Sequence, residues 1–437
     1  MNRPARWATG ATWMLVTSAW LITCHAENWP NWRGPRQNST SKETGLPLFW
    51  REDSGIAWKC PLPGSGDSTP AIWGDAVFIT TQNGSTLELL RINKADGHIV
   101  WTRKVADAPE EPPRKSKGRG QQKFHRLQNM ASPSPVTDGE VVVVHFGNGV
   151  LAAYDFDGHR LWRRNLQQDY GPYTIWWGHA NSPVLFDDLV ISVCMQDSLA
   201  DMQETPAESY LVAHDKQTGR EKWKTPRNTG AQAEQCDAYT TPVLEEIDGR
   251  TDLVVMGGNQ LDAYDPQTGR QRWYMPRLVG GRTITGPTAS GELLFATVGM
   301  RGALLALRGG GAGERSRREA LWKHDAGTPD SCCPVAWGEL LFVITDQGIA
   351  KCFDAHRGHQ HWKRRLGGND YKASPLAVDD RIYCLSRDGL CVVLSASSRF
   401  NQLARNQLDD EFLASPAVSD GHLFLRGQHK LYCIGRR

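Results

Sequence analysis

Apolar residues recur along the chain in short runs separated by polar turns. Examples are VVVVHF at residues 141–146 and LLFVIT at residues 340–345, each bounded by segments rich in Gly, Asp and Asn. Short runs of β-branched and aromatic residues between such turns predict β-strands, because these side chains pack well on a pleated surface. The pattern continues from about residue 58 to the end of the chain, so we predict an all-β protein.

Two segments of ten residues are nearly identical, HDKQTGREKW at residues 214–223 and YDPQTGRQRW at residues 264–273. Each reads as a strand, a tight turn at Gly219 or Gly269 where a positive φ is expected, and a second strand that carries a Trp. Eight further segments each place a Pro before an apolar strand, and they begin at Pro70, Pro135, Pro183, Pro242, Pro287, Pro334, Pro375 and Pro416. The chain therefore contains eight repeated units, each of which reads as four strands.

Repeated units of four short strands are typical of a β-propeller. The last unit stops after three strands, and the strand around Trp58 has no unit of its own. We therefore predict an eight-bladed β-propeller of four-stranded antiparallel blades, closed by an N-terminal strand that completes the last blade. Tryptophans on the outer strands should pack between blades, with Leu403 in the place of Trp in unit seven; they are Trp58, Trp101, Trp162, Trp223, Trp273, Trp322 and Trp362.

The docking pattern in AHDKQTGREKW and AYDPQTGRQRW resembles the PQQ-like repeats of quinoprotein alcohol dehydrogenases. It also resembles the repeats in the β-propeller lipoprotein of the bacterial outer-membrane protein assembly machine. The resemblance extends from about Trp58 to the end of the chain and implies the propeller fold. For function it implies two different possibilities, a protein-binding scaffold or a dehydrogenase that uses PQQ with calcium.

The first residues have the features of an export signal. Arg3 and Arg6 precede the apolar segment TWMLVTSAWLIT, and Cys24 and Ala26 place small residues before a cut after residue 26. Alternatively, Cys24 is lipidated and tethers the protein to a membrane. We expect a signal peptide over residues 1–26, a strap over residues 27–57 with Trp29 and Trp32 buried, and the propeller over residues 58–437. The protein is then periplasmic or extracellular, or a membrane-tethered lipoprotein.

Charge excludes one class of partner. Lys and Arg total 50 against 48 for Asp and Glu, so the chain lacks the strong positive balance of a nucleic-acid groove. The HRGHQH segment, with His356, His359 and His361, has the density of a metal site. It lies in a repeated turn and outer strand, so we predict no metal there.

Long irregular segments should all emerge on one face of the propeller, where function on repeat scaffolds concentrates. The segment YGPYTIWWGH suits either stacking on a planar ligand or sugar, or a plug of the central channel. The basic segment RKSKGRG at residues 114–120 reads as a flexible loop or as a docking site for an acidic partner. The candidate binding residues are Tyr170, Tyr173, Trp176, Trp177, His179, Asp237, Cys332 and Cys333.

Cys332 and Cys333 bear on the enzyme reading, because quinoprotein alcohol dehydrogenases carry an adjacent-cysteine disulfide against their PQQ. Here the pair begins an inner strand of unit six, whereas the family pair lies in an early blade. The acidic calcium ligands and the catalytic Asp of that family cannot be placed in this sequence. We therefore predict a non-catalytic scaffold without a cofactor that binds a protein, peptide or glycan through its loop-rich face. The alternatives are a PQQ-dependent alcohol or sugar dehydrogenase with calcium, and a sensor of a small ligand.

Overall fold

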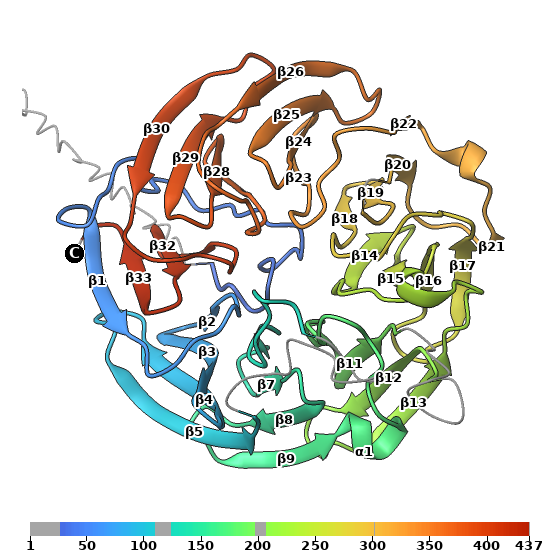
Figure 1. Ribbon diagram of the computed structural model, residues 1–437, viewed down its shortest axis with the longest axis horizontal. Helices are drawn as coiled ribbons and strands as arrows, with labels where there is room; N and C mark the ends of the chain where they lie inside the picture. Colours follow the sequence, from blue (N-terminus) through green and yellow to red (C-terminus); the bar gives the residue numbers. More distant parts are fainter. Residues whose placement is uncertain (1–26, 110–123, 197–206, 301, 437) are drawn as a thin grey trace, which may run out of the picture.

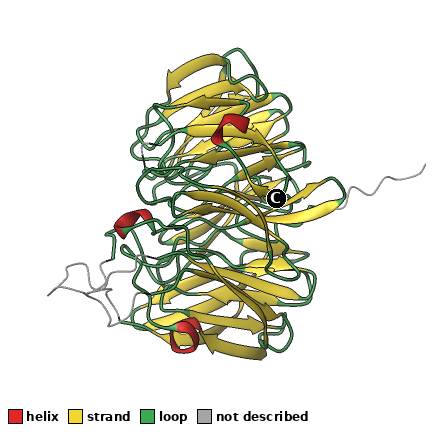
Figure 2. Ribbon diagram, turned by 90° about the vertical axis from the view of Figure 1, so that its right-hand side faces the viewer, coloured by secondary structure: helices red, strands yellow, loops and turns green. Residues whose placement is uncertain are grey.

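Eight antiparallel sheets form a closed ring around a central axis (Figure 1). This computed structural model describes residues 27–109, 124–196, 207–300 and 302–436. Figure 2 shows the ring edge-on, with the strands of the blades stacked across it. The all-β eight-bladed propeller predicted from the repeats is confirmed.

Each blade runs from an inner strand at the axis to an outer strand at the outer edge of the ring. Blade 1 contains β2 Ala71–Trp73, β3 Ala76–Asn83, β4 Thr86–Asn93 and β5 Ile99–Asp107; blade 2 contains β6 Val136–Thr137, β7 Val142–His145, β8 Val150–Tyr154 and β9 Arg160–Asn165. Blade 3 contains β10 Val184–Phe186, β11 Leu189–Cys194, β12 Tyr210–Asp215 and β13 Glu221–Pro226; blade 4 contains β14 Val243–Ile247, β15 Arg250–Gly257, β16 Gln260–Tyr264 and β17 Gln271–Met275.

The second half of the ring repeats this order. Blade 5 contains β18 Thr288–Ser290, β19 Leu293–Thr297, β20 Leu304–Arg308 and β22 Trp322–His324; blade 6 contains β23 Val335–Trp337, β24 Leu340–Ile344, β25 Ile349–Asp354 and β26 Gln360–Arg365. Blade 7 contains β27 Leu376–Val378, β28 Arg381–Leu385, β29 Leu390–Ser395 and β30 Gln402–Gln407; blade 8 contains β31 Ala417–Ser419, β32 His422–Arg426, β33 Lys430–Ile434 and β1 Ile56–Pro61. The described helices are short: α1 Leu166–Tyr170 and the 3₁₀ turns η1 Ala233–Gln235 and η2 Arg317–Glu319. No helix in the described residues is long and apolar enough to span a membrane.

The ring is closed by the N-terminal strand, as predicted. β1 pairs antiparallel with β33, with Trp58 opposite Cys433 and Cys60 opposite Leu431. Because β1 supplies the fourth strand of blade 8, the edge of β33 is covered by a segment from the other end of the chain.

Residues 27–55 form a strap that connects the outer edge of the ring, beside β30, with the centre of the ring (Figure 1). Its centre is Arg33, whose buried guanidinium donates to the carbonyl oxygens of Pro287 (2.7 Å) and Pro334 (3.1 Å) in blades 5 and 6. Trp29 is buried and exchanges backbone hydrogen bonds with Ile72 of blade 1. Trp32 is only half-buried, so the expectation that both strap tryptophans are buried was right for Trp29 alone.

The repeated tryptophans join neighbouring blades. Six of the seven indole N–H groups donate, over 2.8–3.2 Å, to a backbone carbonyl in the outer turn of the next blade; the pairs are Trp58 with Lys94, Trp101 with Phe156, Trp162 with Lys216, Trp223 with Pro266, Trp322 with Ala355 and Trp362 with Ser397. A Cβ added to Gly219 would lie 2.6 Å from the Trp162 ring, and one on Gly269 would lie 2.4 Å from Trp223. The turn therefore requires Gly both for its positive φ and for the ring that lies on it.

The repeat spacing predicts that Leu403 takes the place of the docking tryptophan in blade 7. The structure shows that this prediction is wrong. The register of β29 and β30 places Ala404 opposite Val393, as Trp362 lies opposite Cys352 in blade 6, and Leu403 falls in the bulge. The strap supplies the large ring instead: Trp50 is buried, stacks on Tyr383 at a centroid distance of 6.3 Å, and packs in one cluster with Ala404.

Blade 5 departs from the repeat between β20 and β22. Residues 309–321 replace the usual tight turn, and part of them, β21 Gly313–Glu314, pairs in parallel with β17 of blade 4. Trp273 lies beneath this insertion and donates to Asp252 of its own blade over 3.1 Å. The expectation that long insertions arise only from the loop-rich side was therefore wrong for blade 5.

Candidate functional site

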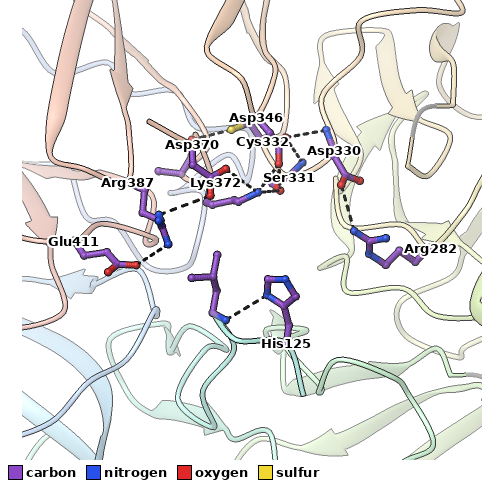
Figure 3. A network of polar contacts seen from close by, with 12 residues as sticks. His125, Arg282, Asp330, Ser331, Cys332, Asp346, Asp370, Lys372, Arg387 and Glu411 are labelled. Carbon is purple, nitrogen blue, oxygen red and sulfur yellow. Dashed lines mark hydrogen bonds and ion pairs between the residues drawn. The ribbon is translucent and has the colours of Figure 1, made fainter. Parts of the chain in front are cut away.

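The candidate site is a rim of charged side chains at the central mouth of the loop-rich face (Figure 3). It is built from the loops that join each outer strand to the next inner strand and from the turns between the two middle strands. These loops come from blades 3 to 8, so the ring of inner strands fixes the distances between them.

Three cations connect the rim, and each one bridges two carboxylates. Lys372 lies 2.6 Å from Asp346 and 3.0 Å from Asp370. Arg387 joins Asp370 (3.7 Å) to Glu411 (3.2 Å). Arg282 joins Asp330 (3.4 Å) to Glu234 (3.8 Å). Every carboxylate in this set therefore faces a positive charge.

Asp346 links the two parts of the chain of charges. Its Oδ1 accepts the backbone N–H groups of Asp330 (3.2 Å) and Ser331 (3.1 Å), while its Oδ2 accepts from the Ser331 hydroxyl over 2.7 Å. Burial lowers the pKa of Lys372, but the bonds to Asp346 and Asp370 outweigh it and raise that pKa above its ordinary value. The rim ammonium is thus held in its charged form.

Next to the Glu411 end of the rim, Asp67 accepts hydrogen bonds from Gln428 (2.7 Å), Asn129 (2.8 Å) and Ser132 (3.1 Å), and the Gln428 backbone N–H donates to the Glu411 carbonyl over 2.9 Å. Burial raises the pKa of Asp67 to about 6, although these bonds and the nearby Arg426 oppose the shift.

Asp67 should make stability fall as pH rises. Because its pKa is raised in the folded state, the folded protein holds this proton more tightly, and the stabilisation is lost between pH 4 and about pH 6. The variant Asp67→Asn should remove on the order of 2–3 kcal/mol of this pH dependence, measured as the difference in denaturant midpoint between pH 4 and pH 7. Identical pH profiles for the parent and the variant would contradict the assignment.

Two of the sequence candidates, Trp176 and Trp177, lie at the mouth and are half-buried. The Trp177 indole donates to Glu234 over 3.0 Å, which extends the chain of charges to an aromatic ring. Trp177 also has a φ of 70° and packs edge-to-face with His125 at 5.8 Å. Buried Asp237 accepts the Trp176 backbone N–H over 3.0 Å, so it positions this loop from below.

The other three aromatic candidates lie away from the mouth. Tyr173 and His179 are buried between blades 2 and 3, where their rings stack at 4.8 Å. Burial lowers the pKa of His179 to about 4 and raises the pKa of Tyr173. Tyr170 donates to Glu221 near the outer strand of blade 3. The structure therefore separates the candidates of the YGPYTIWWGH segment into two buried rings, Tyr173 and His179, and three half-buried ones, Tyr170, Trp176 and Trp177.

Cys332 and Cys333 lie below the rim as two separate, buried thiols. The Cys332 thiol donates to the Ala373 carbonyl over 3.2 Å, and the Cys333 sulfur accepts the Gly286 N–H over 3.2 Å. Burial raises the pKa of Cys332 well above its ordinary value. Each sulfur is thus engaged with a different neighbouring blade.

Comparison with known proteins agrees with this architecture. The sequence matches the family described as outer membrane protein assembly factor BamB over residues 38–197, 119–284 and 311–402. This chain belongs to that family. No curated protein sequence matches it significantly.

Solved structures similar to this BamB-family chain include BamB itself and two dehydrogenases. BamB from Moraxella catarrhalis is 14% identical with a TM-score of 0.56, covering 86% of this chain and 99% of its own. The quinohemoprotein alcohol dehydrogenase from Comamonas testosteroni is 12% identical with a TM-score of 0.65, and the match covers 94% of this chain and 81% of the dehydrogenase. A europium-containing methanol dehydrogenase is 10% identical with a TM-score of 0.63, and the match covers 92% of this chain and 90% of the dehydrogenase. At these identities the likeness shows the shared fold.

The rim residues of this BamB-family propeller were not predicted from the sequence, although many of them lie at a regular place in the repeat. Several lie three to five residues before the Pro that opens the next blade, where the chain enters the axis; they are Arg282, Asp330, Asp370, Lys372 and Glu411. The repeat pattern showed where each inner strand begins, but it could not show which polar side chains turn toward each other across neighbouring blades.

Metal-like clusters lie away from the rim. Among the described residues, the group with a geometry able to hold a cation is Asp155, Asp157 and His159, in the exposed turn between β8 and β9. His356 pairs with Glu339 at 3.1 Å, and His359 packs edge-to-face on His361. The basic segment at residues 114–120 and the leader with Cys24 both lie wholly outside the described residues.

Proposed function

We propose that this chain is an exported scaffold that binds a protein partner through the charged rim and the Trp176–Trp177 loop, without catalysing a reaction. The observation that carries the proposal is the pairing within the rim, where Lys372, Arg387 and Arg282 each bridge two carboxylates. A general acid or base needs a side chain that can exchange its proton with a substrate. Charges held in mutual bridges instead provide a preorganised surface of fixed polarity, which favours specific recognition.

The dehydrogenase alternative requires a calcium site at the mouth, and the residues there do not fit one. Calcium takes six to eight oxygen ligands, several of them carboxylates free to coordinate it. Asp346 and Asp370 instead share the Lys372 ammonium, and Asp330 faces Arg282. Cys332 and Cys333 are buried beneath the rim and bonded to different blades, so neither sulfur is available to a ring lying in the mouth.

Family membership supports a protein partner and export. The family is described by its role in outer membrane protein assembly. The structural match with BamB includes 99% of the BamB chain. A leader over residues 1–26, with or without a lipid at Cys24, would export the chain across the membrane. Two half-buried tryptophans beside fixed charges form the kind of anchor on which protein interfaces concentrate their binding energy.

Site-directed crosslinking tests this function. A photoreactive phenylalanine at Trp177 should give one discrete protein adduct in the producing cell, whereas the same group at exposed His356 on the opposite face should not. The additional change Arg387→Ala should reduce the adduct at least fivefold, because it removes the bridge between Asp370 and Glu411. Equal adducts from both faces, or an adduct unaffected by Arg387→Ala, would contradict the rim as the binding surface.

A second measurement separates scaffold from enzyme. Purified protein incubated with PQQ and calcium should show no quinone absorption after gel filtration and no dye reduction with alcohols or sugars. Calcium-dependent dye reduction that is lost in the variant Cys332→Ser with Cys333→Ser would establish the dehydrogenase instead.

A further inference from the structure

A basic groove lies at the outer edge of the ring, between blades 4 and 5, away from the rim described above. It encloses about 900 Å³. Buried apolar side chains contribute to its lining; they are Leu278, Val298 and Leu305. Five cations and two carboxylates also line it: Arg277, Arg315, Arg317, Arg318 and Lys323, with Glu314 and Asp325. The lining therefore carries three positive charges in excess.

The insertion that departs from the repeat, residues 309–321, forms one wall of this groove. Arg315 anchors it: its guanidinium donates to the carbonyls of Arg308 (2.9 Å) and Gly310 (2.8 Å), and lies over the Trp273 ring at 5.0 Å. A capping box between Ser316 and Glu319 then fixes the turn η2. The wall is thus held in place on both sides of Ser316.

Arg317 and Arg318 project from this fixed turn and are exposed. Neither they nor Arg277 form an ion pair with a carboxylate within the described part of the chain. The Arg317 guanidinium donates to the Arg277 backbone carbonyl over 3.2 Å, so this positive charge is held against the segment that carries Arg277. Arg277 itself has a φ of 63°, a left-handed conformation that non-glycine residues rarely adopt and that clusters at binding sites.

Covering the edge of blade 4 explains only part of the insertion. The pairing of β21 with β17 protects that edge and accounts for Gly313, Glu314 and Arg315. It does not account for two unpaired arginines beyond the pairing, or for Val279, which is 65% exposed beside an apolar lining. An exposed apolar residue among unpaired cations is the composition of a docking surface.

We propose that this groove binds an acidic polypeptide segment that carries an apolar anchor residue. Arg277, Arg317 and Arg318 would bind its carboxylates, and the apolar side chain would enter between Leu278 and Leu305. The concave lining favours a peptide over a membrane, because a flat bilayer surface cannot reach buried Leu278 and Val298. This site is independent of the rim, so it can be tested without knowing the partner bound there.

Fluorescence anisotropy with labelled 12-residue peptides tests the groove. A peptide that alternates Glu with Leu and Phe should bind the full exported chain, and its affinity should fall as salt rises. The variant Arg317→Ser with Arg318→Ser should weaken binding at least tenfold. Arg357→Ser with Arg399→Ser, which removes the same charge from exposed turns of blades 6 and 7, should leave it unchanged.

Three comparisons can overturn the proposal. Equal affinity for the parent and the groove variant would place the peptide elsewhere. Equal affinity for a peptide that alternates Glu with Ser would remove the apolar anchor from the account. Tighter binding of vesicles containing phosphatidylglycerol, again lost in the groove variant, would assign the groove to an anionic membrane instead. Melting curves of all variants should superimpose, because the substituted arginines are all exposed.

Discussion

A chain that begins after Pro61 should lose most of its stability. Removing β1 takes away the outer strand of blade 8, the buried Trp58 ring and the hydrogen bond from Trp58 to Lys94 of blade 1. A buried Trp alone contributes about 3–5 kcal/mol, and its loss here also opens the ring. The expected decrease in the free energy of unfolding is therefore at least about 4 kcal/mol, measured by urea denaturation followed by tryptophan fluorescence.

A second truncation separates the strand from the strap. A chain that begins at Ile56 keeps β1 but lacks the strap with Arg33 and Trp50, so the difference between the two truncated chains reports the closure of blade 8. The chain without β1 should also associate at high concentration, because β33 then presents an uncovered edge. Equal midpoints and equal monomeric behaviour in the two truncated chains would show that β1 does not hold the ring closed.

The propeller could be predicted because each blade solves the same packing problem with the same residues. Gly219 lies under Trp162, and Gly269 lies under Trp223, so the spacing of Gly and Trp is a direct record of contacts between blades. The unfinished last unit likewise revealed that β1 belongs to blade 8. Such features are periodic in sequence, and the structure confirms them.

Features that break the repeat were harder to predict. The repeat spacing predicts that β30 lacks a Trp, but it points to Leu403, one residue away from the true position at Ala404, because the bulge in β30 shifts the register. Nothing local indicated that Trp50, hundreds of residues earlier, packs in the same cluster.

The rim illustrates the same limit for function. Lys372, Arg387 and Arg282 lie on three different loops, and each is an ordinary surface residue when read alone. Their bridges arise only when the closed ring brings successive loops together at the axis. The aromatic segment attracted attention because it is dense in sequence, yet burial removes Tyr173 and His179 from the surface and leaves Trp176 and Trp177 at the mouth.

Trp273→Ala should be the most damaging single substitution among the docking tryptophans. Trp273 is fully buried, whereas Trp101 on blade 1 is half-buried. Its removal leaves a cavity, takes the indole N–H from buried Asp252, and removes the ring under Arg315. We expect a loss of about 3–5 kcal/mol in the free energy of unfolding, against a smaller loss for Trp101→Ala.

Because Trp273 also supports the insertion, its effect should reach beyond stability. Trp273→Phe keeps an aromatic ring for Arg315 but loses the bond to Asp252, so it should cost about 1–3 kcal/mol and retain most binding of the acidic peptide. Trp273→Ala should release the wall of the groove and weaken that peptide even where the protein remains folded, at low urea and low temperature. Equal stability of Trp273→Ala and Trp101→Ala would show that burial of the ring does not set its contribution. Unchanged peptide binding in folded Trp273→Ala would show that the insertion keeps its conformation without the ring beneath it.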